Sequence, residues 1–234
     1  MAQGEKGMVM RPYSLSSAPH EGFLEMVVTW ILKDGRRDDG RGQLTTELFE
    51  PAEDAEFVTM DKARGAFLEP ADDRQLIMVG TGTGIGPYIS ILRNALKTGS
   101  SKRYVLIHGV ARAEDLAYRR ELEDMKEKLD LRYYFTTSRE ETSGRLGAYV
   151  EEPFLKRPEG KSGRVNEEEV KAATSSESSG FPLAEVLGTS LTPEDSAIML
   201  CGNPGMVVNI SALANHAGFV LKKDSPTCGL ERVK

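Results

Sequence analysis

The chain has few of the residues that build disulfide scaffolds or metal centres. It contains 234 residues, of which only 2 are cysteines and 3 are histidines. Two thiols are too few for a disulfide-stabilised fold, a four-cysteine zinc site or an iron–sulfur cluster. His20, His108 and His216 share no spacing typical of metal ligands, so we expect no metal site.

Long hydrophobic runs and an excess of positive charge are also missing. No apolar stretch approaches the roughly 20 residues that cross a bilayer, and the first residues lack the apolar segment of a secretory signal. Lys and Arg total 30 against 36 Asp and Glu, which gives a net charge of −6. This balance provides no general attraction for nucleic acid or anionic lipid. We therefore expect a cytoplasmic monomer or weak oligomer that binds neither, or an organellar protein if a further N-terminal segment precedes this sequence.

The first third of the sequence has a β-rich pattern. Residues 8–17 and 23–32 are apolar, and the turn signal between them contains Pro, His, Glu and Gly, which predicts an antiparallel hairpin. A short helix is expected at residues 43–50 and another strand at residues 56–60. An Asp-Asp-Arg cluster at residues 72–74 marks the expected domain boundary.

From residue 76 onward, short apolar runs alternate with amphipathic segments. Strands are expected at residues 76–79, 104–107, 131–136 and 197–201, and helices at residues 87–97, 113–129 and 204–216. This order is typical of a doubly wound parallel sheet that binds nucleotides. A segment rich in Ser, Glu, Gly and Lys interrupts it at residues 156–180, and we expect a mobile insertion there. The fold class is therefore α/β plus β.

The segment that joins the first of these strands to its helix is the most informative. It has glycines at four alternate positions, residues 80, 82, 84 and 86. Glycines let the backbone approach a ligand closely, and the helix N-terminus behind them suits a pyrophosphate. The spacing differs from the strict G-x-G-x-x-G fingerprint, and tight strand–helix turns also use glycine for purely structural reasons. We expect a nucleotide loop with Gly82, Thr83 and Gly84 in contact with the ligand.

Five motifs occur in a characteristic order along the chain. They are Arg-Pro-Tyr-Ser at residues 11–14, Gly-Thr-Gly-Thr-Gly at 80–84, two segments at 108–118 and 137–145, and Cys-Gly-Asn-Pro-Gly-Met at 201–206. In this order they resemble the bacterial-type ferredoxin–NADP reductases, over most of the chain outside the insertion. The resemblance implies a flavin-dependent oxidoreductase with FAD and NADPH as cofactors and ferredoxin or flavodoxin as the electron carrier.

The resemblance assigns the flavin to the N-terminal motif. It implies that Arg11 binds the FAD pyrophosphate, that Tyr13 stacks on the isoalloxazine and that Ser14 bonds its N5 edge. An arginine is suited to this task because it can hold a pyrophosphate with two parallel hydrogen bonds. The alternative is an ordinary strand with an exposed arginine and a packed tyrosine. A second flavin-phosphate element is implied at Gly42, Leu44 and Thr45.

Ser138, Arg139 and Arg145 follow the third predicted strand and bear on the choice of nicotinamide cofactor. The 2′-phosphate of NADPH favours arginine, whereas NAD-specific sites place an acidic residue on the ribose hydroxyls. We therefore expect NADPH rather than NADH. The alternative is a solvated loop in which these arginines pair locally with Glu140 and Glu141.

Cys201 ends the last predicted strand, at the sheet edge where ligands of open α/β proteins bind. The resemblance implies that this cysteine lies where hydride passes, so that Tyr13, Ser14 and Cys201 form the catalytic group. A small apolar residue that fills a strand end is the structural alternative. The other residues expected to bind the nicotinamide nucleotide are Arg112, Gly202, Asn203, Pro204 and Met206.

Two departures from the family pattern qualify these expectations. Only 10 residues precede the Arg-Pro-Tyr-Ser motif, and no aromatic residue follows residue 219 to cover a flavin. We therefore expect residues 1–72 to form a partial antiparallel β-barrel that binds FAD, and residues 73–234 to form the NADP-binding domain. A cytochrome-b5-reductase-like NADH diaphorase and a non-catalytic nucleotide-binding remnant without flavin remain the alternatives.

Overall fold

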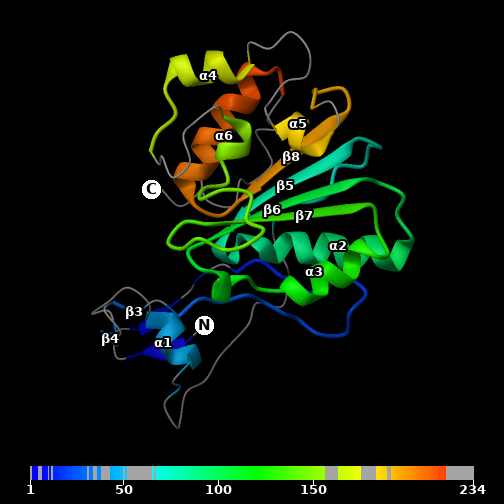
Figure 1. Cartoon of the computed structure of the whole chain (residues 1–234). Coiled ribbons are helices and arrows are strands. Elements are labelled where there is room, and N and C mark those ends of the chain that lie inside the picture. Colours follow the sequence, from blue (N-terminus) through cyan, green and yellow to red (C-terminus); the bar gives the residue numbers. More distant parts are fainter. Residues whose placement is uncertain are drawn as a thin grey trace.

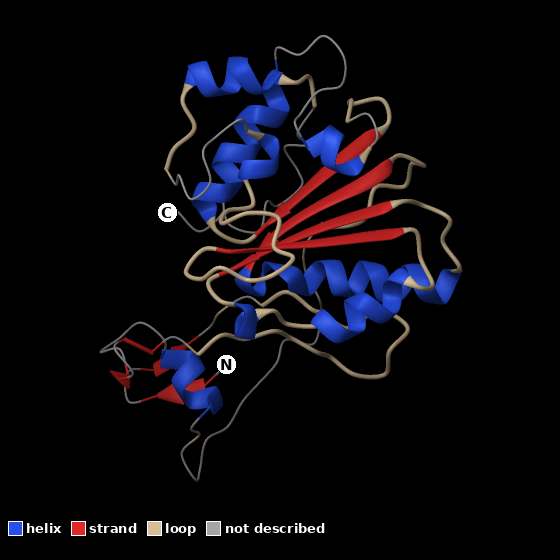
Figure 2. Cartoon of the chain, in the orientation of Figure 1, coloured by secondary structure: helices blue, strands red, loops and turns tan. Residues whose placement is uncertain are grey.

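The computed structural model describes two unequal parts of the chain (Figures 1 and 2). The described residues are 2–4, 7–9, 11, 13–30, 32–33, 36–37, 43–49, 51, 65, 67–155, 163–174, 183–188 and 191–219. The larger part is a parallel sheet with helices on both faces. The smaller part holds short antiparallel pairs and one helix near the N-terminus.

The central sheet contains four parallel strands. They are β5 (Gln75–Thr81), β6 (Tyr104–Val110), β7 (Leu131–Thr137) and β8 (Ser196–Cys201). Their order in the sheet is β7-β6-β5-β8. The chain thus moves outward from β5 to β7 and returns to the other side of β5, so the strand order reverses between β5 and β8. All four predicted strands and the doubly wound arrangement are confirmed.

Helices cover both faces of this sheet (Figure 1). On one face lie α2 (Gly86–Thr98) and α3 (Arg119–Lys126). On the other lie α4 (Glu167–Thr174), α5 (Leu183–Leu187) and α6 (Pro204–His216). Strands buried on both faces explain the continuous apolar runs of the sequence, because neither side of the strand meets water.

Successive side chains of β5 enter two separate cores. Leu76 and Met78 pack on the side of α2 and α3, whereas Ile77 and Val79 pack on the side of α6. All four are fully buried. This division follows from the two-residue period of a strand.

The two neighbouring strands β5 and β8 are linked by side chains as well as by their backbones. The hydroxyl of Tyr88 lies 2.9 Å from the carbonyl oxygens of both Val79 and Met199. At the other end of the strands, Gln75 Nε2 donates to Ser196 Oγ at 2.8 Å. These buried contacts join β5 and β8 near both ends of the strands.

The single helix predicted at residues 113–129 is wrong, because the chain breaks within it. A 3₁₀ turn, η2 (Ala113–Asp115), is followed by Tyr118 with φ 60°, and α3 begins only after this residue. The Tyr118 hydroxyl donates to the Glu25 carboxylate. A contact with a distant segment therefore holds a break that helical periodicity does not reveal.

Residues 163–174, which lie within the segment predicted to be a mobile insertion, contain α4. Asn166 Oδ1 accepts from the backbone N–H of Glu169 at 2.9 Å, and the Glu169 carboxylate accepts from that of Asn166 at 3.1 Å. This reciprocal capping box starts the helix. Val170 and Ala173 are buried in the same core as α6, so the segment is packed. The remainder of the predicted insertion lies outside the described residues.

Short elements make up the N-terminal part. β1 (Ala2–Gly4) pairs with β2 (Gly7–Val9), and β3 (Leu32–Lys33) pairs with β4 (Arg36–Arg37), both antiparallel. The predicted helix is confirmed as α1 (Gln43–Phe49). The strand expected at residues 56–60 lies outside the described residues.

Among the described residues of the predicted hairpin, 8–17 and 23–32, one antiparallel bridge joins the two segments. Leu15 pairs with Met26, and the N–H of Ser16 donates to the carbonyl of Glu25 at 2.8 Å. Next to the bridge, the carbonyls of Ser16 and Ser17 accept hydrogen bonds from Arg93 and Ser90 of α2. The described part of residues 1–72 thus contains two-stranded pairs and this bridge, without a continuous barrel sheet. Nor does any described helix have the length and apolar character needed to cross a membrane.

Candidate functional site

The candidate site lies at the carboxyl ends of β5 and β8, where the strand order reverses. Ligands of open α/β sheets bind at such a point. Gly80 and Cys201 are register partners at this edge. After β5 the chain passes through the 3₁₀ turn η1 (Gly82–Ile85) into α2, and after β8 it enters α6. Two loops and two helix starts therefore share one edge of the sheet.

The two loops pack backbone against backbone. A Cβ atom at Gly84 would lie 2.2 Å from the carbonyl oxygen of Cys201, and one at Gly202 would lie 2.2 Å from Thr81 Oγ1. Both positions therefore require glycine. Gly82 differs, because its φ is 53° and no atom lies within 4 Å of the place a Cβ would take. The outer side of the loop is open, and this cradle fits a phosphate group that approaches the backbone.

Asn203 connects the glycine loop, residues 80–86, to the start of α6. Its backbone N–H donates to Thr81 Oγ1 at 2.7 Å. Its side-chain Oδ1 accepts from the backbone N–H of Gly205 at 2.8 Å and that of Met206 at 3.4 Å. Pro204 occupies the first helical position, where no backbone N–H is needed. The Cys-Gly-Asn-Pro motif is thus explained locally as a strand end followed by a capped helix.

His108 supports the glycine loop from below. It is fully buried, and its Nε2 lies 2.9 Å from the carbonyl oxygen of Gly82. Burial disfavours the charged ring and lowers the pKa of His108 to about 4. The neutral ring therefore donates from Nε2 to Gly82, while its Nδ1 has no hydrogen-bond partner among the described residues.

The supporting role of His108 was missed in the sequence. The available signal was a single histidine within an apolar strand. Its register partner in β5 is Gly80, at the base of the glycine loop.

The loop after β7 runs beside the end of β6. The backbone N–H of Ser138 donates to the carbonyl of Val110 at 3.0 Å, and that of Arg139 to the carbonyl of Ala111 at 2.9 Å. The side chain of Arg139 is exposed and has no ion-pair partner among the described residues. Its guanidinium is therefore available to an anion.

Arg145 has a different environment from Arg139. Its Nη1 donates to the carbonyl oxygens of Thr137 at 3.0 Å and Glu140 at 2.6 Å. Its Nη2 lies 3.9 Å from the Glu141 carboxylate, and only 14% of its side chain is exposed. Arg145 therefore closes the loop. The alternative of local pairing fits this arginine and not Arg139.

Arg112 lies at the end of β6, next to the segment that Arg139 contacts. Its Nη1 is 3.6 Å from the Glu114 carboxylate, with 58% and 74% of the two side chains exposed. Such an exposed pair contributes little to stability, so Arg112 is held loosely. Arg112 and Arg139 therefore lie at the carboxyl ends of β6 and β7, and neither side chain is held tightly.

The N-terminal motif lies against the start of α2. A Cβ atom at Gly86 would lie 3.8 Å from the carbonyl oxygen of Ser14 and 3.1 Å from Ser16 Oγ. Tyr13 and Ser14 are half-buried, whereas Arg11 is exposed. Because Gly86 directly follows the glycine turn, Ser14 is close to the crevice that Gly84 and Cys201 form.

Two further flavin candidates lie on α1. Leu44 is buried and Thr45 is half-buried, while Gly42 lies outside the described residues. The rings of Trp30 and Phe49 stack at 5.3 Å between centroids with planes 7° apart. This contact attaches α1 to the segment that follows the Leu15–Met26 bridge.

Cys201 is buried at the end of β8, with 3% of its surface exposed. No group of three or more His, Cys, Asp or Glu side chains among the described residues is placed to hold a metal ion. A site without a metal stays a prediction. The geometry favours Cys201 as a small buried side chain at the closest approach of the two loops.

Comparisons with known proteins agree with this geometry. The oxidoreductase NAD-binding domain family matches residues 78–211, which is more than half of the chain. A flavodoxin/ferredoxin–NADP reductase of Buchnera aphidicola is 31% identical over 204 residues, covering 86% of this chain and 69% of the relative. Ferredoxin–NADP reductase A of Sorangium cellulosum is 29% identical over 226 residues, covering 90% of this chain and 68% of the relative.

Solved structures give the same result. A ferredoxin NADP⁺ reductase from Neisseria gonorrhoeae, with bound FAD and NADP, has a TM-score of 0.68 at 25% identity and covers 97% of this chain and 80% of its own. The cytochrome b5 reductase domain of Ulva prolifera nitrate reductase has a TM-score of 0.62 at 18% identity, covering 95% and 79%, and shares the fold. The resemblance found in the motifs is confirmed, and the chain belongs to the ferredoxin–NADP reductase family of oxidoreductases.

Proposed function

We propose that this chain passes electrons between NADPH and a one-electron carrier protein, ferredoxin or flavodoxin, through bound FAD. The observation that carries the proposal is the meeting of three motifs at one point. Ser14 lies against Gly86 at the end of the glycine loop, and Gly84 of the same loop lies against Cys201. The names of the relatives supply the carrier class.

The glycine loop and the start of α2 bind the pyrophosphate of NADPH. The backbone N–H groups at the helix start and the positive end of the helix dipole attract an anion there, and the open side of Gly82 leaves room for it. His108 holds the carbonyl of Gly82 away from the phosphate side. The residues that would contact NADPH at this edge are Gly82, Thr83, Gly84, Gly202, Asn203, Pro204 and Met206.

The loop after β7 selects NADPH over NADH. Arg139 supplies the cation for the 2′-phosphate, and Ser138 and Arg112 complete the anion site from neighbouring segments. A guanidinium forms paired hydrogen bonds with a phosphate, which ammonium groups cannot reproduce. Arg145 keeps the loop in shape through the carbonyls of Thr137 and Glu140.

The N-terminal part, residues 1–72, holds FAD in a partial barrel beside the NADP-binding domain of residues 73–234. FAD, when bound, accepts a hydride at N5 and releases electrons one at a time. Arg11 neutralises the FAD pyrophosphate, Tyr13 stacks on the ring and Ser14 donates a hydrogen bond to its edge. Gly42, Leu44 and Thr45 form the second phosphate element.

The small side chain of Cys201 leaves room at the point where the nicotinamide and isoalloxazine rings approach each other. Its burial keeps water out, and alignment of the reacting groups is the main task of the protein. A cytoplasmic location and a monomeric or weakly oligomeric state stay predictions.

The visible spectrum of the purified chain tests this proposal. We expect a yellow protein, or one that turns yellow with added FAD, whose absorbance NADPH bleaches without air more efficiently than NADH. Ser14→Ala should slow this bleaching, whereas Ser101→Ala, in an exposed loop, serves as the matched control. Failure to bind FAD would indicate the non-catalytic remnant, and preference for NADH would indicate the diaphorase.

A further inference from the structure

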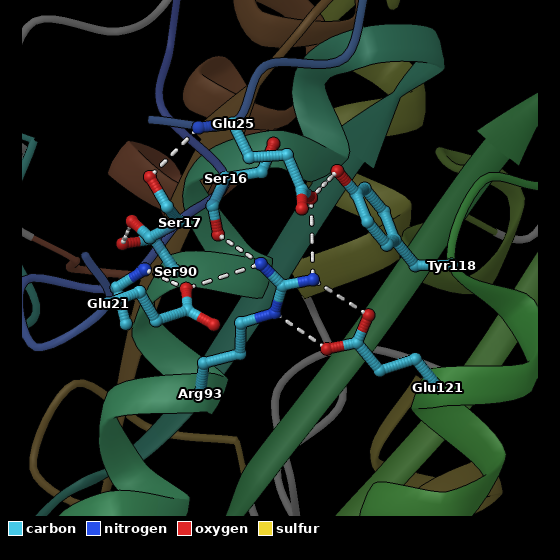
Figure 3. Close-up of polar contacts among 9 residues, drawn as sticks. Ser16, Ser17, Glu21, Glu25, Ser90, Arg93, Tyr118 and Glu121 are labelled. Atoms are coloured by element: carbon cyan, nitrogen blue, oxygen red, sulfur yellow. Dashed lines mark hydrogen bonds and ion pairs between the residues drawn. The ribbon is translucent and has the colours of Figure 1, made fainter. Parts of the chain in front are cut away.

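A cluster of polar contacts joins the N-terminal part to α2 and α3 around Arg93 (Figure 3). Arg93 Nε and Nη2 donate to the two carboxylate oxygens of Glu121 at 2.6 and 3.0 Å. Nη1 donates to the carbonyl of Ser16 at 3.4 Å and to the Glu21 carboxylate at 3.3 Å. Nη2 also lies 3.3 Å from the Glu25 carboxylate. Each of the five guanidinium hydrogens therefore has an acceptor.

The environment keeps this guanidinium charged and in place. Only 14% of its side chain is exposed, and the Glu121 carboxylate raises the pKa of Arg93 above its already high value. The ring of Tyr118 lies beneath the guanidinium, 5.5 Å from its central carbon, and the Tyr118 hydroxyl binds Glu25. Lysine has three donors on one nitrogen and cannot span these acceptors.

The contacts come from one face of α2. Gly86, Ser90 and Arg93 are spaced four and three residues apart, which places them on the same side of the helix. Ser90 Oγ donates to the carbonyl of Ser17 at 2.8 Å, and the missing side chain of Gly86 admits Ser16 Oγ. This face of α2 is therefore the surface on which residues 14–26 dock.

Residues 14–26 are also closed on themselves. The N–H of Ser16 donates to the carbonyl of Glu25 at 2.8 Å, and the N–H of Glu25 donates to Ser17 Oγ at 3.1 Å. The N–H of Ala18 donates to the Glu21 carboxylate at 2.6 Å. Because the segment is internally bonded, a contact at its carboxylates also fixes its beginning, where Ser14 lies.

We propose that Arg93 is a positioning residue for electron transfer between NADPH and FAD. It ties residues 14–26 to α2 and so fixes how the flavin side faces the glycine loop at the start of the same helix. The inference rests on the proposed function. Reacting atoms must be held about 3–3.5 Å apart, and a displacement of about 1 Å caused by a remote substitution slows a reaction by roughly 100-fold.

Arg93→Lys in the full chain loaded with FAD tests this role. We expect the rate constant of flavin bleaching at saturating NADPH to fall by about tenfold to 100-fold. The dissociation constant for NADP⁺ should stay within about threefold, because the glycine loop itself is unchanged. Hydrogen exchange should rise in residues 14–26 and stay constant in β5. Arg103→Lys is the matched control, since Arg103 pairs only with Asp130 at the opposite edge of the sheet among the described residues.

Two results would overturn the inference. One is a normal bleaching rate with unchanged exchange in residues 14–26, and the other is an equal loss of NADP⁺ affinity and of exchange protection in β5, which would indicate general unfolding. Glu121→Gln provides a milder variant that keeps the side-chain shape, and it should change the rate in the same direction by a smaller factor. If the wild-type chain fails to react with NADPH, the proposed function fails, while the exchange measurement still tests the contact.

Discussion

Two regions at the same sheet edge are built in opposite ways. Between β5 and β8, backbone packs against backbone, and Gly84 and Gly202 leave no room for a Cβ atom. After β7, the candidate contact is Arg139, an exposed side chain on a loop that Arg145 closes. Ligand recognition in the first region would depend on the shape of the backbone, and in the second on the charge of a side chain.

This difference separates two kinds of recognition. In the crevice, the residues that would bind a ligand also hold the sheet together, so a substitution changes stability and binding at once. At the β7 loop, an exposed arginine adds charge without supporting the core, so we expect a substitution to change which nucleotide binds and to leave the fold intact. Four changes test this contrast, in order of decreasing effect.

Gly84→Ala should have the largest effect. The added Cβ atom would lie 2.2 Å from the carbonyl oxygen of Cys201, so β5 and β8 must separate. We expect the free energy of unfolding to fall by roughly 3–5 kcal/mol and NADP⁺ affinity to fall by more than about 100-fold. Urea denaturation and calorimetric titration measure the two quantities.

Gly99→Ala is the control for this change. Gly99 ends α2 with φ 65° and open space around it, so alanine there introduces only backbone strain of about 1 kcal/mol. NADP⁺ affinity should be unaffected. Equal effects of the two substitutions would mean that the crevice is less tightly packed than these distances indicate.

The second largest effect should be a loss of stability at acidic pH, caused by His108. Its pKa is about 4 in the folded chain against a usual value of 6.5. Between these values the unfolded chain binds a proton that the folded chain does not, so stability falls as the pH drops from about 6.5 to 4. This pKa shift corresponds to a loss of about 3 kcal/mol in the free energy of unfolding.

Urea denaturation of His108→Gln at several pH values measures this contribution. The amide of glutamine keeps a hydrogen-bond donor but does not titrate, so the variant should lose less stability on acidification than the wild type. His20→Gln, at an exposed turn, is the control variant. An unchanged slope in His108→Gln would show that the proton is taken up elsewhere.

Arg139→Gln should alter specificity with little effect on the fold. Loss of a charged hydrogen bond to the 2′-phosphate should raise the KM for NADPH by about tenfold to 100-fold and leave that for NADH unchanged. Steady-state kinetics with both nucleotides measures the ratio. Arg120→Gln, another exposed arginine, is the control. A parallel loss with NADH would contradict a role in 2′-phosphate recognition.

Glu141→Gln should have the smallest effect. Its carboxylate lies 3.9 Å from Arg145 Nη2 and 94% of its side chain is exposed, so water screens the pair. Thermal unfolding and NADPH affinity should both match the wild type. A measurable change in either would mean that the loop depends on charge as well as on the carbonyl contacts of Arg145.

Much of the α/β part could be predicted because its signals are local. The expected helix at residues 204–216 has the bounds of α6, since Asn203 caps it and Pro204 starts it. The break at Tyr118 could not be predicted, because Glu25 holds it from far away in the sequence. The start of α4 at Asn166 carried a capping signal, which the polar composition around it obscured.

The candidate site shows the same division. The glycine loop and the Cys-Gly-Asn-Pro segment were found because each is a contiguous motif. The contacts of Arg93 and His108 were missed, since they depend on partners on other elements. Likewise, sequence spacing alone could not separate the available Arg139 from Arg145, whose guanidinium is already committed to backbone carbonyls.

The pairing of β5 with β8 joins segments that lie far apart in the sequence. Gln75 and Ser196, which bond across these strands, are 121 residues apart, whereas β6 follows β5 closely. Contacts of such long sequence separation form late, and during synthesis β8 leaves the ribosome after the other three strands. We therefore expect the crevice to be the last part of the sheet to be completed. Acquisition of NADP⁺ affinity during refolding would mark the end of folding, and a chain stalled before residue 196 would have the β7 loop but no crevice.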